Sequence, residues 1–220
     1  MQAHHHIDGS RPVSAGVIAA LDVFIDQVED APSGVVPVIA GTGAPGTDHT
    51  EPPDVALVNK WERVLRRLER LNRPTVAVVH GDCGGIAVEA LLATDLRVAA
   101  AGTRLYLPAG PGGVWPGMGL YRLANQVGFA RVRRWILFGN PLSAAEAVGA
   151  QLVDEVAEDT AAAIANAVAR LETEDGTDVA VRRQLMLDAT TTPFEEALGR
   201  HLAACDRLLR RTREVANAAG

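Results

Sequence analysis

A paired glycine and a single acid stand out in the stretch HGDCGGIAVEALLATDLRVAA, residues 80–100. Gly84 and Gly85 come directly after an apolar run and directly before an apolar helical pattern that carries one carboxylate, Glu89. A strand that runs through such a turn into a helix leaves free backbone N–H groups at the positive end of the helix dipole. The turn could therefore bind an oxyanion, although two glycines before a helix are also common where elements pack tightly.

Glu89 follows Gly85 by four residues, just over one helical turn, so the spacing places both on one side of the helix. A carboxylate on an apolar helix face is destabilising if it has no partner. We therefore expect Glu89 to have either a buried partner or a catalytic role as a general acid/base.

The elements that position these residues follow from apolar periodicity and turn residues. Apolar residues at helical spacing predict helices over residues 13–28, 55–71, 85–94, 120–127, 130–138, 144–150, 160–171 and 179–215, the last broken near 190–193. Continuous or β-branched apolar runs predict strands over residues 35–41, 74–81, 152–156 and, as two short strands, 95–107. Ser14 is the expected N-cap of the first helix, and Trp61 lies on the apolar face of the second. Strands that alternate with helices indicate an α/β protein with a mainly parallel sheet.

The composition is that of a single globular domain of 220 residues, with 48% hydrophobic and 22% charged residues. No run approaches the roughly 18 apolar residues of a membrane span, and the start of the chain lacks a secretory signal pattern, so we expect no membrane association and a cytoplasmic location. The net charge of −6 disfavours nucleic acid as a partner.

The cysteine and histidine patterns do not indicate a metal site. Cys83 and Cys205 are far apart and lack partners at ligand spacing, so we expect each to be a small buried or half-buried hydrophobic residue. The triplet His4, His5 and His6 is too short and too close to the terminus to predict a metal site. We expect no metal and no bound cofactor.

Residues 80–156 resemble, without a gap, the central segment of the crotonase (enoyl-CoA hydratase/isomerase) superfamily. Besides the glycine turn and its acid, the corresponding motifs are Asp95-Leu96-Arg97, Trp115-Pro116-Gly117 and the stretch 137–154. The likeness extends over roughly residues 13–160. It implies an α/β, crotonase-like ββα spiral over residues 1–160 and a C-terminal helical oligomerisation region over 161–220, which packs on the core or on a neighbouring subunit of a homotrimer or hexamer.

The resemblance also implies chemistry on an acyl-CoA thioester, whose enolate is stabilised by two backbone N–H groups. One donor corresponds to Ile86, preceded by Gly85, and the isoleucine would narrow the pocket. The other belongs to the early loop at Ala44 or Gly46.

The early loop departs from the family pattern. If Asp48 takes the position of the family's loop aspartate, Pro45 falls where the first donor should be, and proline has no N–H. The position of the family's second glutamate falls on Ala109, so the resemblance leaves Glu89 as a single acid/base.

Further residues are candidates for contacts with the substrate. Tyr106, Trp115 and Gly113 are expected to line the substrate pocket, with the CoA carried by the substrate itself. Arg11, Lys60 and the arginines of 131–134 are open candidates for the CoA phosphates.

Within the superfamily, five segments resemble the enoyl-CoA-hydratase-like proteins of dihydroxyphenylglycine biosynthesis, which accompany a type III polyketide synthase. They are residues 7–22, 60–71, 81–100, 115–124 and 198–211. The resemblance implies dehydration or aromatisation of the synthase product towards 3,5-dihydroxyphenylacetyl-CoA. Two alternatives stay open: a non-catalytic accessory protein that binds the synthase or its product, and a different acyl-CoA hydratase or isomerase.

Overall fold

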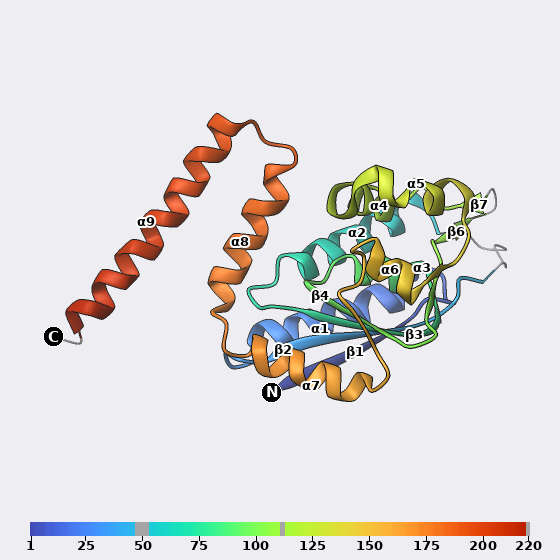
Figure 1. Ribbon diagram of the computed structural model, residues 1–220, viewed down its shortest axis with the longest axis horizontal. Coiled ribbons are helices and arrows are strands. Elements are labelled where there is room, and N and C mark those ends of the chain that lie inside the picture. The colour runs from blue at the N-terminus through green and yellow to red at the C-terminus, as the bar shows by residue number, and fades with distance from the viewer. Residues whose placement is uncertain (47–52, 111–112, 219–220) are drawn as a thin grey trace.

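A parallel sheet forms the centre of the chain (Figure 1). The computed structural model describes residues 1–46, 53–110 and 113–218. The main strands lie in the order β1 (Gln2–Asp8), β2 (Val36–Gly43), β3 (Val76–Cys83), β4 (Leu96–Ala100) and β9 (Glu155–Ala157), each parallel to its neighbour. The short strand β5 (Arg104–Leu105) pairs in parallel with the end of β3 and antiparallel with β8 (Leu142–Ser143). Strand β6 (Ala109–Gly110) pairs with β7 (Gly113–Val114) in a separate antiparallel sheet.

Helices connect and cover the strands, close to the predicted ranges. They are α1 (Ala15–Asp30), α2 (Val55–Glu69), α3 (Gly85–Leu91), α4 (Met118–Leu123), the π-helix η1 (Ala124–Gly128), α5 (Phe129–Phe138), α6 (Ala144–Gly149), α7 (Thr160–Leu171), α8 (Gly176–Ala189) and α9 (Phe194–Ala218). Ser14 caps α1 as predicted, since its side chain accepts a hydrogen bond from the Val17 N–H. The helix expected over 85–94 is shorter than predicted and ends at Leu91.

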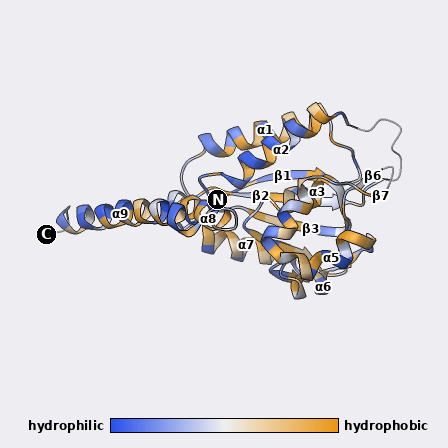
Figure 2. Cartoon of the chain, turned by 90° about the horizontal axis from the view of Figure 1, so that it is seen from above, coloured by the Kyte–Doolittle hydropathy of each residue, from blue (hydrophilic) through white to orange (hydrophobic). Residues whose placement is uncertain are grey.

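The sheet is covered on both faces, as the continuous apolar run of β3 predicts. Ala77 and Val79 face the larger core cluster, to which α1, α2 and α3 contribute. Val76 and Val78 face the other side, where α7 packs. Figure 2 shows α1 and α2 on one side of the strands and α7 on the other.

Strand β1 was not predicted, because the histidine triplet obscures its alternation. From Gln2 to Ile7 the residues Ala3, His5 and Ile7 are less exposed than those between them, which is the period of two expected for one covered face. The His5 ring stacks on Phe24 with centroids 5.1 Å apart, and His6 Nε2 lies 2.8 Å from Thr42 Oγ1. The histidines therefore belong to the sheet.

The Asp95-Leu96-Arg97 motif has a structural role at the start of β4. The buried Arg97 side chain donates to the carbonyls of Leu92 (3.0 Å) and Thr94 (3.2 Å) and to Gln126 Oε1 (2.6 Å), so it satisfies acceptors left free at the end of α3. Asp95 accepts hydrogen bonds from the Thr75 N–H and hydroxyl, at 2.8 and 2.9 Å. These contacts fix the far end of the helix that carries Glu89.

The C-terminal helices differ in how they contact the core. Helix α7 lies on the sheet, and α8 is fixed by Arg183, which pairs with Asp95 at 2.6 Å and donates to the carbonyls of Glu69, Leu71 and Arg73. Helix α9 runs back along α8 and stands apart from the sheet (Figure 1). The division of the chain at residue 160 stays a prediction.

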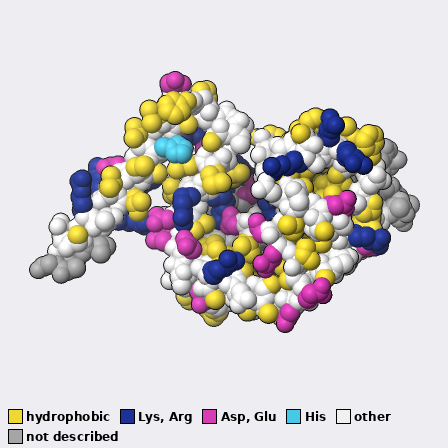
Figure 3. Space-filling view, in the orientation of Figure 1, with side chains coloured by type: hydrophobic (Ala, Val, Ile, Leu, Met, Phe, Trp, Pro, Cys, Tyr) yellow, Lys and Arg dark blue, Asp and Glu magenta, His cyan; other side chains and the backbone are white. Residues whose placement is uncertain are grey.

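Apolar side chains are exposed on the C-terminal arm, which consists of α8 and α9. Figure 3 shows hydrophobic side chains along α8 and α9 on the face in view, and the large exposed ones are Met186, Phe194, Leu198, Leu202, Leu208 and Leu209. Cys205 is also exposed on α9, so the expectation of a buried or half-buried cysteine is wrong there, whereas Cys83 is buried as predicted. Cys205 differs because α9 has no core beneath it in the single chain. Among the described residues, no helix combines the length and the apolar character that a membrane crossing requires.

Candidate active site

Glu89 is buried and points inward from α3. Only 3% of the residue is exposed, and its Oε2 accepts a hydrogen bond of 2.8 Å from the indole N–H of Trp61 on α2. Trp61 is itself 1% exposed. The carboxylate that the sequence places on an apolar helix face thus has a buried partner on a different helix.

The environment of Glu89 favours its neutral form. Burial raises the pKa of Glu89 from 4.5 to about 7, because the charged carboxylate loses its hydration. The hydrogen bond from Trp61 opposes this increase, the negative charge of Glu62 adds to it, and the positive charge of Arg122 lowers it. A carboxyl group with this pKa can both accept and donate a proton near neutral pH.

The second oxygen of Glu89 faces the loop before α4 and the first turn of that helix. A methyl group built on Gly117 would come within 3.0 Å of Glu89 Oε1 and 2.8 Å of Trp115 Cδ1. A methyl group on Gly119 would lie 3.6 Å from the same oxygen. The structure therefore brings Glu89 and the predicted pocket residue Trp115 to one place, and the glycines leave space there.

The glycine turn is packed closely from three sides. A Cβ on Gly84 would lie 2.4 Å from Pro45 Cδ and 2.8 Å from the Tyr106 carbonyl oxygen, and one on Gly85 would lie 2.5 Å from the Gly9 carbonyl oxygen. Gly85 also has a φ of +52°, a left-handed conformation that favours glycine. Tight packing is thus sufficient to explain why both residues are glycine.

The same turn still presents backbone donors. The N–H groups of Gly85 and Ile86 begin α3, and neither has a hydrogen-bond acceptor among the residues that the structure describes. Ile86 is 4% exposed, so its N–H lies in a largely desolvated position. Free N–H groups at a helix start, with Glu89 one turn further along, are the geometry that an oxyanion site requires.

The early loop lies against this turn, as the close approach of Pro45 to Gly84 shows. Ala44 and Gly46, the predicted alternatives for the other donor, flank Pro45; Ala44 is half-buried and Gly46 is exposed. Asp48, whose match to the family's loop aspartate places Pro45 at the donor position, lies outside the described residues.

The other predicted pocket residues are more loosely connected with Glu89. The Tyr106 ring lies beneath the Arg104 guanidinium, 5.9 Å from its carbon, and the Tyr106 N–H donates to the Cys83 carbonyl at 2.8 Å. Gly113 pairs with Gly110 in the β6–β7 hairpin, where Ala109 pairs with Val114. Tyr106 therefore borders the glycine turn, whereas Gly113 belongs to the hairpin that precedes Trp115.

A buried ion cluster beside Glu89 was not predicted. Arg122 on α4 donates to Glu69 Oε1 at 2.6 Å and to Glu62 Oε2 at 2.8 Å, and both acids are on α2. Glu69 and Arg122 are each 6% exposed. In the sequence these charged residues look like members of a solvated helix face. The one signal that α2 lies close to the site is that a buried Trp61 and a buried Glu89 each need a polar partner.

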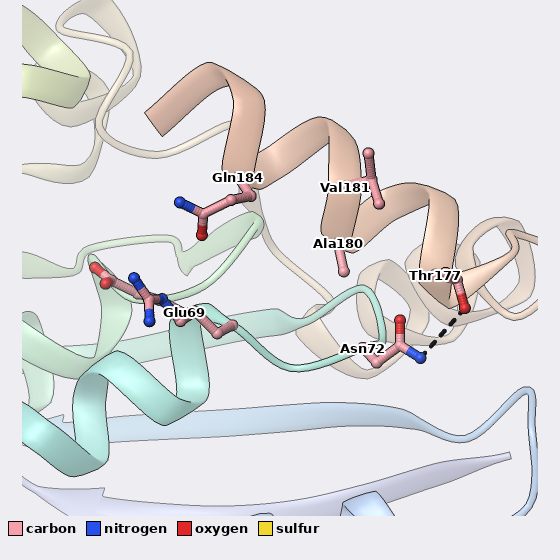
Figure 4. Close-up of a pocket in the computed structure, with 7 residues that line it drawn as sticks. Glu69, Asn72, Thr177, Ala180, Val181 and Gln184 are labelled. Carbon is pink, nitrogen blue, oxygen red and sulfur yellow. Dashed lines mark hydrogen bonds between the residues drawn. The ribbon is translucent and has the colours of Figure 1, made fainter. Parts of the chain in front are cut away.

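A separate groove of about 510 Å³ lies between the end of α2 and α8 (Figure 4). Asn72 Nδ2 donates to Thr177 Oγ1 across one end of it at 3.3 Å. Its lining consists of Glu69, Arg70, Asn72, Thr177, Ala180, Val181 and Gln184. None of the predicted site residues lines this groove, so it is distinct from the space beside Glu89. In the part of the chain that the structure describes, no group of three His, Cys, Asp or Glu side chains could hold a metal ion.

Comparison with known proteins identifies the family. The family profile described as enoyl-CoA hydratase/isomerase matches residues 45–218. The chain belongs to this family. An enoyl-CoA-hydratase from Amycolatopsis orientalis is 45% identical over 205 residues, which are 93% of this chain and 94% of that protein. A probable enoyl-CoA hydratase from Bacillus subtilis (strain 168) is 29% identical over 175 residues, 74% of this chain and 68% of that protein.

Solved structures of the enoyl-CoA hydratase/isomerase family share the fold. The crystal structure of an enoyl-CoA hydratase from Thermoplasma volcanium GSS1 matches with a TM-score of 0.81 at 20% identity, covering 99% of this chain and 92% of that chain. An enoyl-CoA hydratase from Shewanella pealeana ATCC 700345 matches with a TM-score of 0.79 at 16% identity, over 94% of this chain and 84% of that chain. The predicted crotonase-like α/β fold is thereby confirmed.

Proposed function

We propose that this enoyl-CoA hydratase/isomerase family member eliminates water from a 3-hydroxyacyl-CoA thioester, with Glu89 as its single acid/base. The observation that carries the proposal is the state of Glu89: a buried carboxyl group with one oxygen bound by Trp61, the other facing Gly117 and Gly119, and a pKa of about 7. Ala109 at the position of the family's second glutamate supports a mechanism with one carboxyl group.

One carboxyl group is sufficient for this elimination. The Glu89 carboxylate removes a proton from C2 of the substrate, and the electron pair moves onto the thioester oxygen to form an enolate. The thioester carbonyl then reforms as the C2–C3 double bond forms and the C3–O bond breaks. Glu89 returns its proton to the departing hydroxyl group, which leaves as water, and the carboxylate is regenerated.

The enolate needs donors that are in place before the charge develops. We assign one to the Ile86 N–H, supported by its lack of an acceptor among the described residues, with the Gly85 N–H beside it. Ala44 or Gly46 supplies the other, because Pro45 has no N–H. Loss of one such donor typically costs about 3 to 4 kcal/mol of transition-state stabilisation.

For the physiological substrate, we propose a CoA-bound product of a type III polyketide synthase, dehydrated or aromatised towards 3,5-dihydroxyphenylacetyl-CoA. The support is the likeness of five segments to the enoyl-CoA-hydratase-like proteins of dihydroxyphenylglycine biosynthesis. Formation of an aromatic ring drives such an elimination, so the reaction does not demand a second acid. Ile86, which is bulkier than glycine, favours a particular acyl group in the pocket.

We also propose that the chain assembles as a homotrimer or hexamer through its C-terminal arm. Phe194, Leu198, Leu202 and Leu209 follow one face of α9 at helical spacing and are exposed in the single chain. An exposed apolar stripe of this length is typical of a face that another protein surface covers.

The test of the proposed function is Glu89→Gln, assayed with the purified synthase and its CoA product. Glutamine can still accept the hydrogen bond from Trp61 but cannot exchange a proton, so dehydration should fall at least about tenfold. Glu158→Gln, at an exposed position between β9 and α7, should keep the wild-type rate. Equal rates for Glu89→Gln and the wild type would refute the catalytic proposal.

The alternative function is that of an accessory protein that binds the synthase or its product without chemistry of its own. Ala109 and Pro45 favour it, because they replace a family acid and a backbone donor. Glu89→Gln separates the two, since an accessory protein should support product formation equally well with either residue. A different acyl-CoA hydratase or isomerase activity would appear in a mass-spectrometric survey of products from common acyl-CoA thioesters.

A further inference from the structure

The hydrogen bond between Trp61 and Glu89 constrains where the carboxyl proton can be. The indole N–H is only a donor, and in a neutral carboxyl group the carbonyl oxygen accepts a hydrogen bond better than the hydroxyl oxygen, so the bond favours the carbonyl form of the oxygen that the indole contacts. That oxygen is Oε2, at 2.8 Å from Trp61 Nε1. In the neutral acid the proton therefore sits on Oε1, the oxygen that faces Gly117 and Gly119.

We propose that Trp61 is a positioning residue for Glu89: its indole N–H holds Oε2 and leaves Oε1 as the oxygen that exchanges a proton with the substrate. This inference rests on the proposed function, in which Glu89 is the acid/base. It extends that function by naming a residue from a different helix, which acts through Glu89, as the one that sets the direction of proton transfer.

The surrounding helices hold Trp61 in place. Helix α2 carries Trp61 together with Glu62 and Glu69, and both acids bind Arg122 on α4. Helix α4 also carries Gly119, which faces Glu89. The ion pairs therefore hold α2 against α4. Helix α2 orients the Glu89 carboxyl group through Trp61, and α4 borders the Oε1 oxygen of Glu89.

Helices α2 and α4 place charged side chains near Glu89. Helix α2 contributes Glu62 and Glu69, the latter also paired with Arg66 at 2.8 Å, and α4 contributes Arg122. Of these, Glu62 and Arg122 act on the proton affinity of Glu89 in opposite directions. The hydrogen bond from Trp61 favours the ionised form, so its removal should raise the pKa of Glu89.

Trp135 provides a matched control in the same chain. It is 4% exposed on α5, and its indole N–H has no hydrogen-bond partner among the described residues. Trp135→Phe removes the same N–H group from a buried site without breaking such a bond. Trp61→Phe and Trp135→Phe therefore differ mainly in the contact with Glu89.

The experiment follows the indole N–H signals of the ¹⁵N-tryptophan-labelled full-length protein as a function of pH, without substrate. The chain has three tryptophans, and Trp115→Phe and Trp135→Phe assign the Trp61 signal by elimination even if Trp61→Phe does not fold. The Trp61 signal should shift with a midpoint near pH 7, and Glu89→Gln should abolish that shift while the Trp135 signal stays unchanged. A Trp61 signal that does not move, or that moves equally in Glu89→Gln, overturns the inference.

Kinetics then test the positioning role itself. At pH 7, Trp61→Phe should lower kcat about tenfold, as expected for one hydrogen bond to a charged group, and leave KM unchanged. The rise of kcat with pH should move to higher pH in Trp61→Phe, whereas Trp135→Phe should retain the wild-type profile. If Trp61→Phe keeps the wild-type kcat and profile while Glu89→Gln is inactive, the inference fails and the proposed function stands. If Glu89→Gln is fully active, the proposed function itself fails.

Discussion

Glu89→Gln should make the protein more stable at high pH than the wild type. A buried acid whose pKa is raised is neutral at low pH and must carry an uncompensated charge at high pH. Glutamine has the same shape, can accept the same hydrogen bond from Trp61 and stays neutral throughout. Replacing the proposed acid/base by glutamine should therefore increase the free energy of unfolding. Such an increase would indicate that Glu89 is kept for function at the expense of stability.

The magnitude follows from the two protonation equilibria. The carboxyl group titrates at about 4.5 in the unfolded chain and at about 7 in the folded one. Between these values the folded state binds more protons than the unfolded state, so the free energy of unfolding falls as the pH rises. The loss begins near pH 4.5, is complete above pH 7 and amounts to about 3 kcal/mol. Because Glu89 is almost fully buried, solvent screening does not reduce this figure much.

Urea unfolding of the wild type and Glu89→Gln between pH 4.5 and 8.5 measures the effect. Protomer concentration is held constant, since assembly contributes to apparent stability. The difference in free energy of unfolding should grow by about 3 kcal/mol in favour of the variant across this range. Glu158→Gln controls for the general loss of a carboxylate. A difference that does not depend on pH would show that Glu89 is not held neutral by burial, and would remove the physical basis of its acid/base role.

Two further predictions concern the space beside Glu89 and the C-terminal arm. Gly117→Ala places a methyl group within 3.0 Å of Glu89 Oε1 and 2.8 Å from Trp115 Cδ1, so neighbouring side chains must move and dehydration should fall more than tenfold. Gly119→Ala, whose methyl group lies at ordinary contact distance, should retain most activity in the same assay, and equal effects of the two would contradict this account. Leu202→Asp should shift the assembly towards monomer in analytical ultracentrifugation, and an unchanged oligomer would exclude this face of α9 from the interface.

The sequence by itself determined most of the elements and the centre of the candidate site. Apolar periodicity and the N-cap Ser14 located α1, and the continuous run before Gly84 predicted a strand covered on both faces. The spacing of Gly85 and Glu89 was sufficient to place an acid one turn from free backbone donors. These features are local, because helix and strand periods are set by residues a few positions apart.

The tertiary structure decided which distant residues meet. Trp61 binds Glu89 although 28 positions separate them, and Arg122 joins two acids of α2 that look solvated in the sequence. The exposure of Cys205 and the strand pairing of the histidine triplet also depend on what lies next to them in space. No local pattern encodes such contacts, since each depends on how separate elements pack. The sequence thus provided the acid of the candidate site, and the packing of α2 and α4 against α3 set the orientation of its carboxyl group.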